Sequence, residues 1–446
     1  MAKHSGVTCR ACGAHAPRWS GQCPRCGAWN AMVDPRETGA AVTPLSSVAS
    51  LEGAAIPTGI AEFDRLFGGG LLPGSATLLY GEPGAGKSTL LSQVAASVAA
   101  QGRRALLLCA EESAAQVRRR AERLGELPES LLICCTTDLA EATEAICSSG
   151  AEVVVVDSVQ ALRSNDLQGS PGAPAMVRAV AEALVAIAKA NGPALLLVGH
   201  VTKDGDLAGP RALEHLVDTV VSVEGDRHQA LRIARAVKHR FGAVGEVGLF
   251  ELGARGLAQV TDPAGALLAE YAHGVAGSAL AVVLEGHRPL VIELQTLCVD
   301  AHGERGRRST TGVDGARCNL LLAVLEARCG RSFAGLDLFA SATGGLRATE
   351  PAADLPLALA LVGAAENLAL PAHLVAFGEV GLAGELRRVP GAERRLAEAA
   401  RLGLRQAIVP AGSPDGPESL LVHKVSTLQE ALALVTEPTL RVAGAA

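Results

Sequence analysis

The stretch GEPGAGKST, residues 81–89, constrains the fold more than any other part of this chain. It fits the phosphate-loop pattern G-x-x-x-x-G-K-[ST], in which glycines let backbone N–H groups surround a phosphate. The lysine contacts the β- and γ-phosphate oxygens, and the serine hydroxyl completes a Mg²⁺ shell. Residues 76–80 predict a buried strand before the loop and 88–100 a helix after it, which places the phosphate at a helix N-terminus. We therefore expect ATP and Mg²⁺ to be bound by the loop residues Gly81, Glu82, Pro83, Gly84, Ala85, Gly86, Lys87, Ser88 and Thr89.

Length and charge limit the classes of protein that remain possible. The chain of 446 residues is long enough for two or three domains, and with 49% hydrophobic residues it can bury substantial cores. Its net charge is −6 and only 2% of residues are aromatic, which argues against a global nucleic-acid surface and against base-stacking platforms. Any nucleic-acid contact must be local, or created by assembling several copies of the chain.

The cysteines and the apolar segments bear on the cellular compartment. The first residues, MAKHSGVTCR, lack the apolar core of a signal peptide, and no apolar run is long enough to span a membrane. Of eleven cysteines, four lie within the first 26 residues and the others are scattered through apolar segments. This distribution favours a cytoplasmic protein with free thiols and one metal site over a disulfide framework.

The four N-terminal cysteines form two C-x-x-C pairs separated by ten residues. Such pairs supply four thiolates that close a tetrahedron around Zn²⁺, and a redox dithiol pair is the alternative. Both tryptophans of the protein, Trp19 and Trp29, lie in the same segment, so we expect metal and a packed indole to hold this small module. The predicted structural zinc ligands are Cys9, Cys12, Cys23 and Cys26.

After the phosphate loop, predicted strands and helices alternate, which indicates a parallel sheet with crossover helices. The strand at 151–160 carries Asp157 at its tip, the Walker B position of a carboxylate that supports Mg²⁺. The strand at 105–110 is followed by Glu111, which can polarise the attacking water. A helix N-cap region is the alternative explanation for Glu111. His200 follows a further strand and is either a γ-phosphate sensor or an ordinary strand-end residue.

Shorter strands at 218–225, 230–239 and 246–253 are joined by hairpin-like turns and predict antiparallel additions to the sheet. The segment KHRFG lies between the last two. Its cations, Lys238 and Arg240, could complete the nucleotide site of a neighbouring subunit, as arginine fingers do.

Together these features resemble the bacterial RadA (Sms) family of recombination and repair proteins, related to RecA and DnaB-type motors. The likeness covers essentially the full chain and rests on the cysteine pairs, GEPGAGKST, the segment 209–228 and KHRFG. The family signature is K-N-R-F-G, so His239 replaces the usual asparagine, and Cys109-Ala110 replaces a usual Ser-Gly. The resemblance implies a homo-hexameric ring with single-stranded DNA in its pore. By the same resemblance, residues 163–172 and 201–211 are expected to be the pore loops. Lys203 and Arg211 are then the expected contacts to DNA phosphates.

Residues from 272 onward resemble the proteolytic domain of Lon. Lon-type catalysis needs a serine activated by a lysine, but this chain has Ala352 and Glu393 at those positions. The resemblance therefore implies an inactive scaffold for ring assembly. Its possible DNA-binding surface consists of Arg305, Arg307 and Arg308.

The sequence thus predicts an α/β chain with a RecA-like P-loop ATPase core between a zinc knuckle module and a Lon-protease-like α+β domain. The predicted boundaries are 1–33 for the zinc module, 34–55 for a linker, 56–265 for the ATPase and 272–446 for the last domain. The expected function is a DNA-dependent ATPase and helicase-type motor. It would promote branch migration on single-stranded and branched DNA with the RecA recombinase in DNA repair. A Lon-type ATP-dependent protease and a KaiC-like signalling ATPase are the alternatives, and translocation polarity stays open.

Overall fold

The computed structural model forms two compact units, Met1–Gly53 and Ala54–Ala446. Each unit is described by itself. The structure describes residues 7–9, 14–16, 18–29, 31–33, 44, 46, 55–167, 169–190, 192–199, 211–225, 230–262, 265, 268, 271, 274–301, 306–343 and 346–436.

The first unit contains a small antiparallel sheet. Strand β1 (Val7–Cys9) pairs with β2 (His15–Ala16) on one side and with β3 (Met32–Val33) on the other. Its buried residues form one cluster of Val7, Cys9, Cys23 and Met32. The predicted packed indole is wrong: Trp19 and Trp29 are 61% and 72% exposed, because strands of two or three residues provide no second layer to cover an indole.

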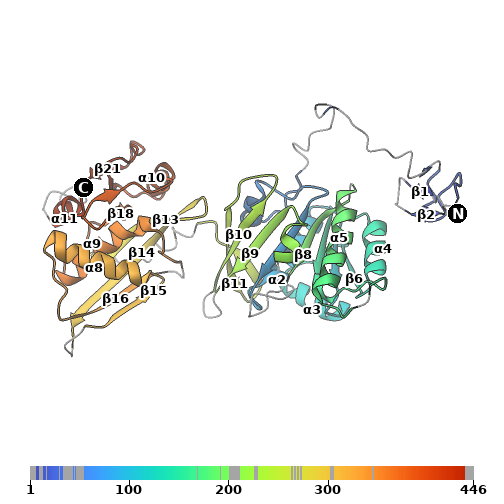
Figure 1. The fold of residues 1–446 in the computed structure, drawn as a ribbon, viewed down its shortest axis with the longest axis horizontal. Helices are drawn as coiled ribbons and strands as arrows, with labels where there is room; N and C mark the ends of the chain where they lie inside the picture. Colours follow the sequence, from blue (N-terminus) through green and yellow to red (C-terminus); the bar gives the residue numbers. More distant parts are fainter. Residues whose placement is uncertain are drawn as a thin grey trace, which may run out of the picture. The chain divides into compact units, whose positions relative to one another are not determined.

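The second unit begins with a nine-stranded sheet in the order β12-β11-β10-β9-β4-β8-β7-β5-β6. Strands β8, β9 and β10 of this sheet are labelled in Figure 1. The six strands from β9 to β6 are parallel, and β10, β11 and β12 add to them in antiparallel fashion. The strands are β4 (Ala76–Gly81), β5 (Ala105–Cys109), β6 (Leu131–Cys135), β7 (Val153–Asp157), β8 (Ala194–Val198), β9 (Thr219–Glu224), β10 (Leu231–His239), β11 (Val247–Gly253) and β12 (Gly256–Gln259).

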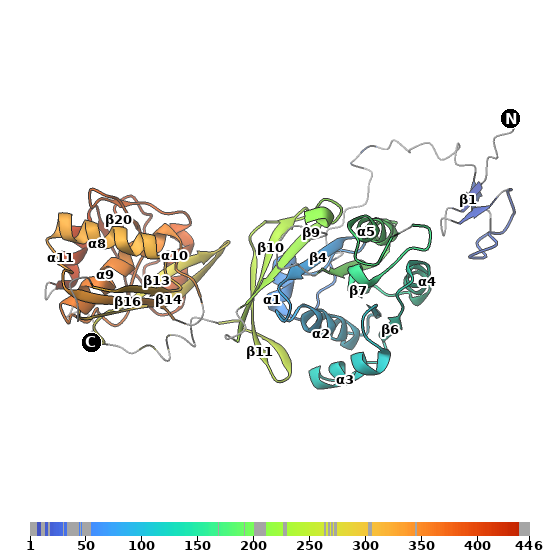
Figure 2. The same cartoon turned by 60° about the horizontal axis from the view of Figure 1, so that its bottom comes forward.

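Helices cover both faces of this sheet, as Figures 1 and 2 show for α2 and α5. One hydrophobic cluster packs α2 against the sheet, and a separate cluster packs α4 and α5 against it. The helices are α1 (Ala61–Asp64), α2 (Lys87–Ala100), α3 (Ala114–Leu124), α4 (Leu139–Ser149), α5 (Pro174–Lys189) and α6 (Arg211–Glu214). The predicted parallel sheet with crossover helices and antiparallel additions is confirmed.

A seven-stranded mixed sheet follows, in the order β15-β16-β14-β13-β17-β20-β21. Helices α8, α9 and α11 contribute to one hydrophobic cluster with it, and α10 contributes to another. Figure 2 shows α8 and α9 lying along β13, β14 and β16. The predicted α+β architecture of the C-terminal region is therefore confirmed. The elements are β13 (Ser278–Glu285), β14 (Arg288–Asp300), β15 (Arg308–Thr311), α8 (Gly315–Cys329), β16 (Leu336–Ala342), α9 (Asp354–Ala365), β17 (Leu374–Ala376), β18 (Glu379–Val380), β19 (Leu386–Arg387), α10 (Ala392–Arg401), β20 (Gln406–Pro410), β21 (Leu421–Val425) and α11 (Leu428–Thr436).

Candidate nucleotide site and zinc module

The phosphate loop connects the end of β4 to the start of α2. Gly84 and Gly86 have φ angles of 86° and 95°, in the left-handed region that favours glycine. Helix α2 begins at Lys87, so its unpaired first-turn N–H groups face the loop. The Lys87 ammonium donates to the carbonyls of Gly81 (2.8 Å) and Glu82 (3.0 Å). Burial lowers the pKa of Lys87, while the nearby Asp157 carboxylate acts in the opposite direction.

The two carboxylates that the sequence singled out lie at the same edge of the sheet as the loop. Asp157 ends β7 and pairs in register with Cys109, the last residue of β5. Glu111 follows two residues later and accepts a hydrogen bond of 2.5 Å from the Ser158 hydroxyl. The structure therefore places Asp157 and Glu111 at neighbouring strand ends, with the Asp157 carboxylate near enough to Lys87 to influence its pKa.

Sequence reasoning missed Arg120 of α3. Its guanidinium lies 2.5 Å from Glu112 and 3.8 Å from the Asp157 carboxylate. The Arg120 side chain is only 17% exposed, whereas its neighbour Arg119 is exposed. It lies one helical turn from the buried Val117, a spacing that could have indicated an inward-facing side chain.

The KHRFG segment lies at the opposite edge of the sheet from this chain's own phosphate loop. Thr219 of β9 pairs both with Thr77 at the start of β4 and with His239 at the end of β10. Gly81, where the loop begins, is four residues further along β4, about 13 Å. Lys238 and Arg240 therefore do not reach the nucleotide site of their own chain.

Within one chain the two cations have defined partners. The Lys238 ammonium donates to the carbonyls of Glu214 (2.5 Å) and Val217 (2.8 Å), at the C-terminal end of α6. Arg240 is half exposed and is held by Asp218 at 3.2 Å. Asp218 also accepts the N–H of Ala76, so Arg240 is anchored to the first residue of β4.

The predicted DNA contacts are only partly described. Lys203, Arg305 and His200, with the side chain of Arg211, lie outside the described residues. Arg307 and Arg308 are exposed; the Arg307 N–H donates to Asp337, and the Arg308 guanidinium donates to Asn319 at 2.9 Å. The structure places both of them at the start of β15.

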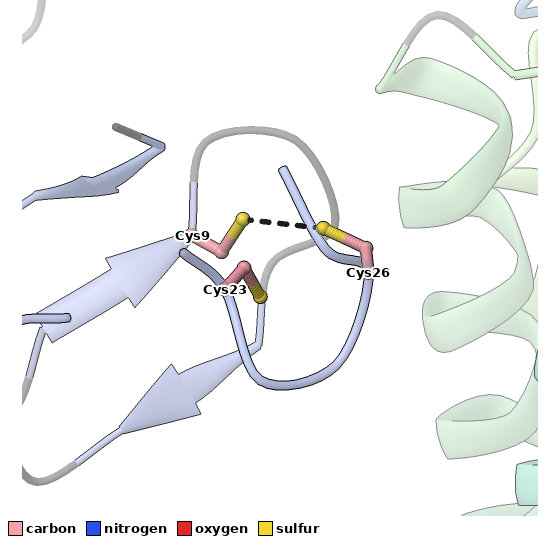
Figure 3. Close-up of side chains that lie close together, drawn as sticks. All are labelled: Cys9, Cys23 and Cys26. Atoms are coloured by element: carbon pink, nitrogen blue, oxygen red, sulfur yellow. Dashed lines mark hydrogen bonds between the residues drawn. The ribbon is translucent and has the colours of Figure 1, made fainter. Parts of the chain in front are cut away.

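Three cysteines converge in the N-terminal unit (Figure 3). The sulfur atoms of Cys9, Cys23 and Cys26 all lie within 4.8 Å of one another, and those of Cys9 and Cys26 are 3.7 Å apart. The backbone N–H of Cys26 helps to lower the pKa of Cys23 to about 6, which favours the thiolate that binds metal. Cys12, the fourth predicted ligand, lies outside the described residues. The donor set fits a tetrahedral Zn²⁺ site.

The Lon-type catalytic positions contain no usable nucleophile. Ala352 is 1% exposed and packs in the hydrophobic cluster that includes α10. Glu393 lies in the first turn of α10. A methyl group cannot attack a peptide carbonyl, and a carboxylate cannot replace the lysine in the Ser-Lys arrangement.

Fold and phosphate loop together define a RecA-like P-loop ATPase, with ATP and Mg²⁺ as cofactors and Zn²⁺ in the N-terminal module. Comparison with known families supports each part. The model of the AAA domain matches residues 43–206, that of the rubredoxin metal binding domain matches 8–34, and that of subunit ChlI of Mg-chelatase matches 342–413.

Whole-chain relatives identify the family. The chain is 43% identical to DNA repair protein RadA of Mycolicibacterium smegmatis, covering 99% of this chain and 98% of the relative. It is 40% identical to RadA of Bacillus subtilis (97% and 99% covered) and 41% identical to RadA of Escherichia coli (96% and 97% covered). The chain belongs to the RadA family, which confirms the resemblance stated from the motifs.

A solved structure of a KaiC-like protein, PH0186 from Pyrococcus horikoshii OT3, is also similar. It is 22% identical, with a TM-score of 0.40, and the match covers 46% of this chain and 98% of that one. In the part of the chain that the structure describes, no helix has both the length and the apolar character needed to cross a bilayer.

Proposed function

We propose that this protein is a DNA-dependent ATPase and helicase-type motor that acts in the cytoplasm as a homo-hexamer. It promotes branch migration on single-stranded and branched DNA with the RecA recombinase during DNA repair. Its relatives are named DNA repair protein RadA. The observation that carries the motor proposal is the position of Lys238 and Arg240 at the sheet edge opposite Gly81. In a ring, this edge of one subunit can face the phosphate loop of the next.

The residues of the loop edge have separate roles in hydrolysis. Lys87 binds the β- and γ-phosphate oxygens, which replace the loop carbonyls as its partners. Ser88 and Asp157 hold Mg²⁺, which neutralises charge on the phosphates when bound. Glu111, oriented by Ser158, positions the attacking water and takes its proton. Arg240 of a neighbouring subunit stabilises the charge that develops on the γ-phosphoryl group.

Assembly explains how an acidic chain binds DNA. Six copies bring a few cations per chain to one axis, so a net charge of −6 is no obstacle. We propose Lys203 and Arg211 as contacts to the strand in the pore. Arg305, Arg307 and Arg308 provide a second surface on the C-terminal domain.

The test is an unwinding assay on a three-strand recombination intermediate, with ATPase activity measured in parallel. Lys87→Ala and Arg240→Ala should each abolish both activities, while Arg178→Ala, an exposed arginine paired with Glu182, should leave them unchanged. Mixing Lys87→Ala with Arg240→Ala should restore part of the ATPase activity, because mixed rings contain some intact interfaces. Wild-type unwinding by Lys87→Ala would overturn the motor proposal, and no recovery at any mixing ratio would overturn the shared site.

The alternatives make different predictions. A Lon-type protease would hydrolyse peptides, which the buried methyl group of Ala352 cannot support. A KaiC-like signalling ATPase would hydrolyse ATP at a rate that single-stranded DNA does not change.

A further inference from the structure

The C-terminal domain contains a pocket of about 890 Å³ that the motor function does not use. Three segments line it: the turn between β13 and β14, the entry to α10, and the loop after β20. Its volume is in the range of pockets that hold a nucleotide-sized ligand. The polar and charged side chains on its wall are His287, Arg388, Glu393, Arg394 and Ser413.

The start of α10 forms one side of the pocket. This helix has ten residues, and Gly391 before it has a φ of 69° and provides no side-chain cap. The first N–H groups of a helix have no partner within the helix and carry a partial positive charge. Residues 391–394 all line the pocket, so these donors are available to an anion there.

Ser413 provides a second, independent indication of a ligand. Ser413 is one of the residues that line the pocket, and it is only 5% exposed. Among the described residues, its hydroxyl has no hydrogen-bond partner. A buried hydroxyl without a hydrogen-bond partner costs free energy, and a bound ligand that accepts its hydrogen bond would remove this cost.

The charged groups on the wall favour an anion. Arg388 donates to the carbonyl of Gly412 at 3.3 Å, which holds its guanidinium over the loop that carries Ser413. In the described part of the chain, no salt bridge engages Arg394. The one opposing charge is Glu393, which is exposed and competes for the same helix N-terminus.

We propose that this pocket binds a phosphate monoester. The phosphoryl group is held by the Ser413 hydroxyl, the first N–H groups of α10 and the guanidinium of Arg388. Leu284, Val389 and Pro414 line the remainder of the pocket and provide an apolar surface for the body of the ligand. A tetrahedral dianion satisfies donors from three directions at once, which a planar carboxylate does less well. The monoester can belong to a free nucleotide or to the 5′ end of a nucleic-acid strand.

The test measures binding of inorganic phosphate, AMP, and a dinucleotide with a 5′-phosphate or a 5′-hydroxyl, by titration calorimetry. The full chain carries Lys87→Ala in every sample, so that the phosphate loop contributes little. Ser413→Ala and Arg388→Ser should each weaken phosphate binding about tenfold, the loss expected for one hydrogen bond to a charged group. Glu393→Gln should strengthen it several-fold because a competing carboxylate is removed.

Matched controls are Ser332→Ala and Arg387→Ser. Ser332 is exposed and does not belong to the residues that line the pocket. Arg387 neighbours Arg388 in the sequence, but it pairs with Glu385 and does not line the pocket. Neither control should change binding. Tighter binding of AMP than of either dinucleotide assigns the site to a free nucleotide, and selective binding of the 5′-phosphorylated dinucleotide assigns it to a strand end. Absent phosphate binding, equal binding of AMP and both dinucleotides, or insensitivity to Ser413→Ala and Arg388→Ser would each overturn the proposal.

Discussion

The Ser158 hydroxyl donates a hydrogen bond of 2.5 Å to a carboxylate oxygen of Glu111. Ser158 follows Asp157, the last residue of β7, and is fully buried, whereas Glu111 lies after the neighbouring strand β5 and is exposed. The bond therefore connects the proposed metal-supporting strand to the residue that we propose positions water. It fixes the position of one carboxylate oxygen of Glu111.

Ser158→Ala should lower the ATPase turnover number about tenfold, because an unrestrained Glu111 spends less time in the productive orientation. Nucleotide affinity should not change, since Ser158 does not belong to the phosphate loop. Steady-state hydrolysis and equilibrium binding of a fluorescent ATP analogue separate the two effects. Ser148→Ala, at an exposed site on α4, is the control. Wild-type turnover in Ser158→Ala would show that Glu111 needs no such support.

Arg120→Ala should lower the Mg²⁺ concentration required for half-maximal ATPase activity several-fold. The guanidinium lies 3.8 Å from Asp157, so it weakens the attraction of that carboxylate for a second cation. A Mg²⁺ titration at saturating ATP measures the effect. Arg119→Ala removes the same charge from an exposed neighbouring position and should leave the titration unchanged. A higher Mg²⁺ requirement in Arg120→Ala would contradict this electrostatic account.

Local patterns were enough to propose a nucleotide site, because its parts are short segments with fixed chemistry. The loop at 81–89 is recognised by its glycine-rich turn. The strand end at Asp157 is recognised by the run of apolar residues that precedes the acid. Strand β6 was not predicted, since it is only partly buried and lacks a clean alternation of apolar and polar residues. The position of Arg240 relative to the loop depends on the register between β9 and β10, which short segments do not encode.

Glu62→Gln should lower the free energy of unfolding of the second unit, Ala54–Ala446, by about 3 kcal/mol. Glu62 is 1% exposed, pairs with Arg288 of β14 and accepts the N–H of Leu249 of β11 at 2.9 Å. Glutamine retains an acceptor for Leu249 but leaves the Arg288 cation without its anionic partner. The midpoint of urea unfolding measures the loss, and Arg288→Met in the same chain should recover part of it.

Glu366→Gln is the matched control for that measurement. Its partner Arg331 and Glu366 itself are each about one-third exposed, so the pair contributes less than about 1 kcal/mol. If Glu62→Gln shifted the urea midpoint no more than Glu366→Gln, the buried pair would not stabilise the fold.

Cys23→Ser should eliminate zinc from the purified protein. The thiolates of Cys9, Cys23 and Cys26 converge, and the loss of one ligand opens a site whose surrounding core contains only a few apolar residues. Metal analysis should give one zinc per chain in the wild type and much less in the variant. Cys329→Ser, in α8, should retain the wild-type content. Full zinc content in Cys23→Ser would place the metal on other residues.

His239 should make stability depend on pH in a way that His239→Asn removes. Its ring lies against Phe67 and Phe241, and its Nδ1 is 2.8 Å from the Thr219 hydroxyl. Burial lowers its pKa from the ordinary value of 6.5, so the folded state favours the neutral ring. The unfolded state therefore binds more protons as pH falls through 6.5, and stability that is fully present above this pH is lost below it.

The midpoint of urea unfolding, measured between about pH 5 and pH 7.5, should rise with pH in the wild type. The rise should be less steep in His239→Asn. The control His287→Asn, at an exposed position, should give the wild-type slope. Identical slopes in the wild type and His239→Asn would mean that this histidine titrates alike in the folded and unfolded chains.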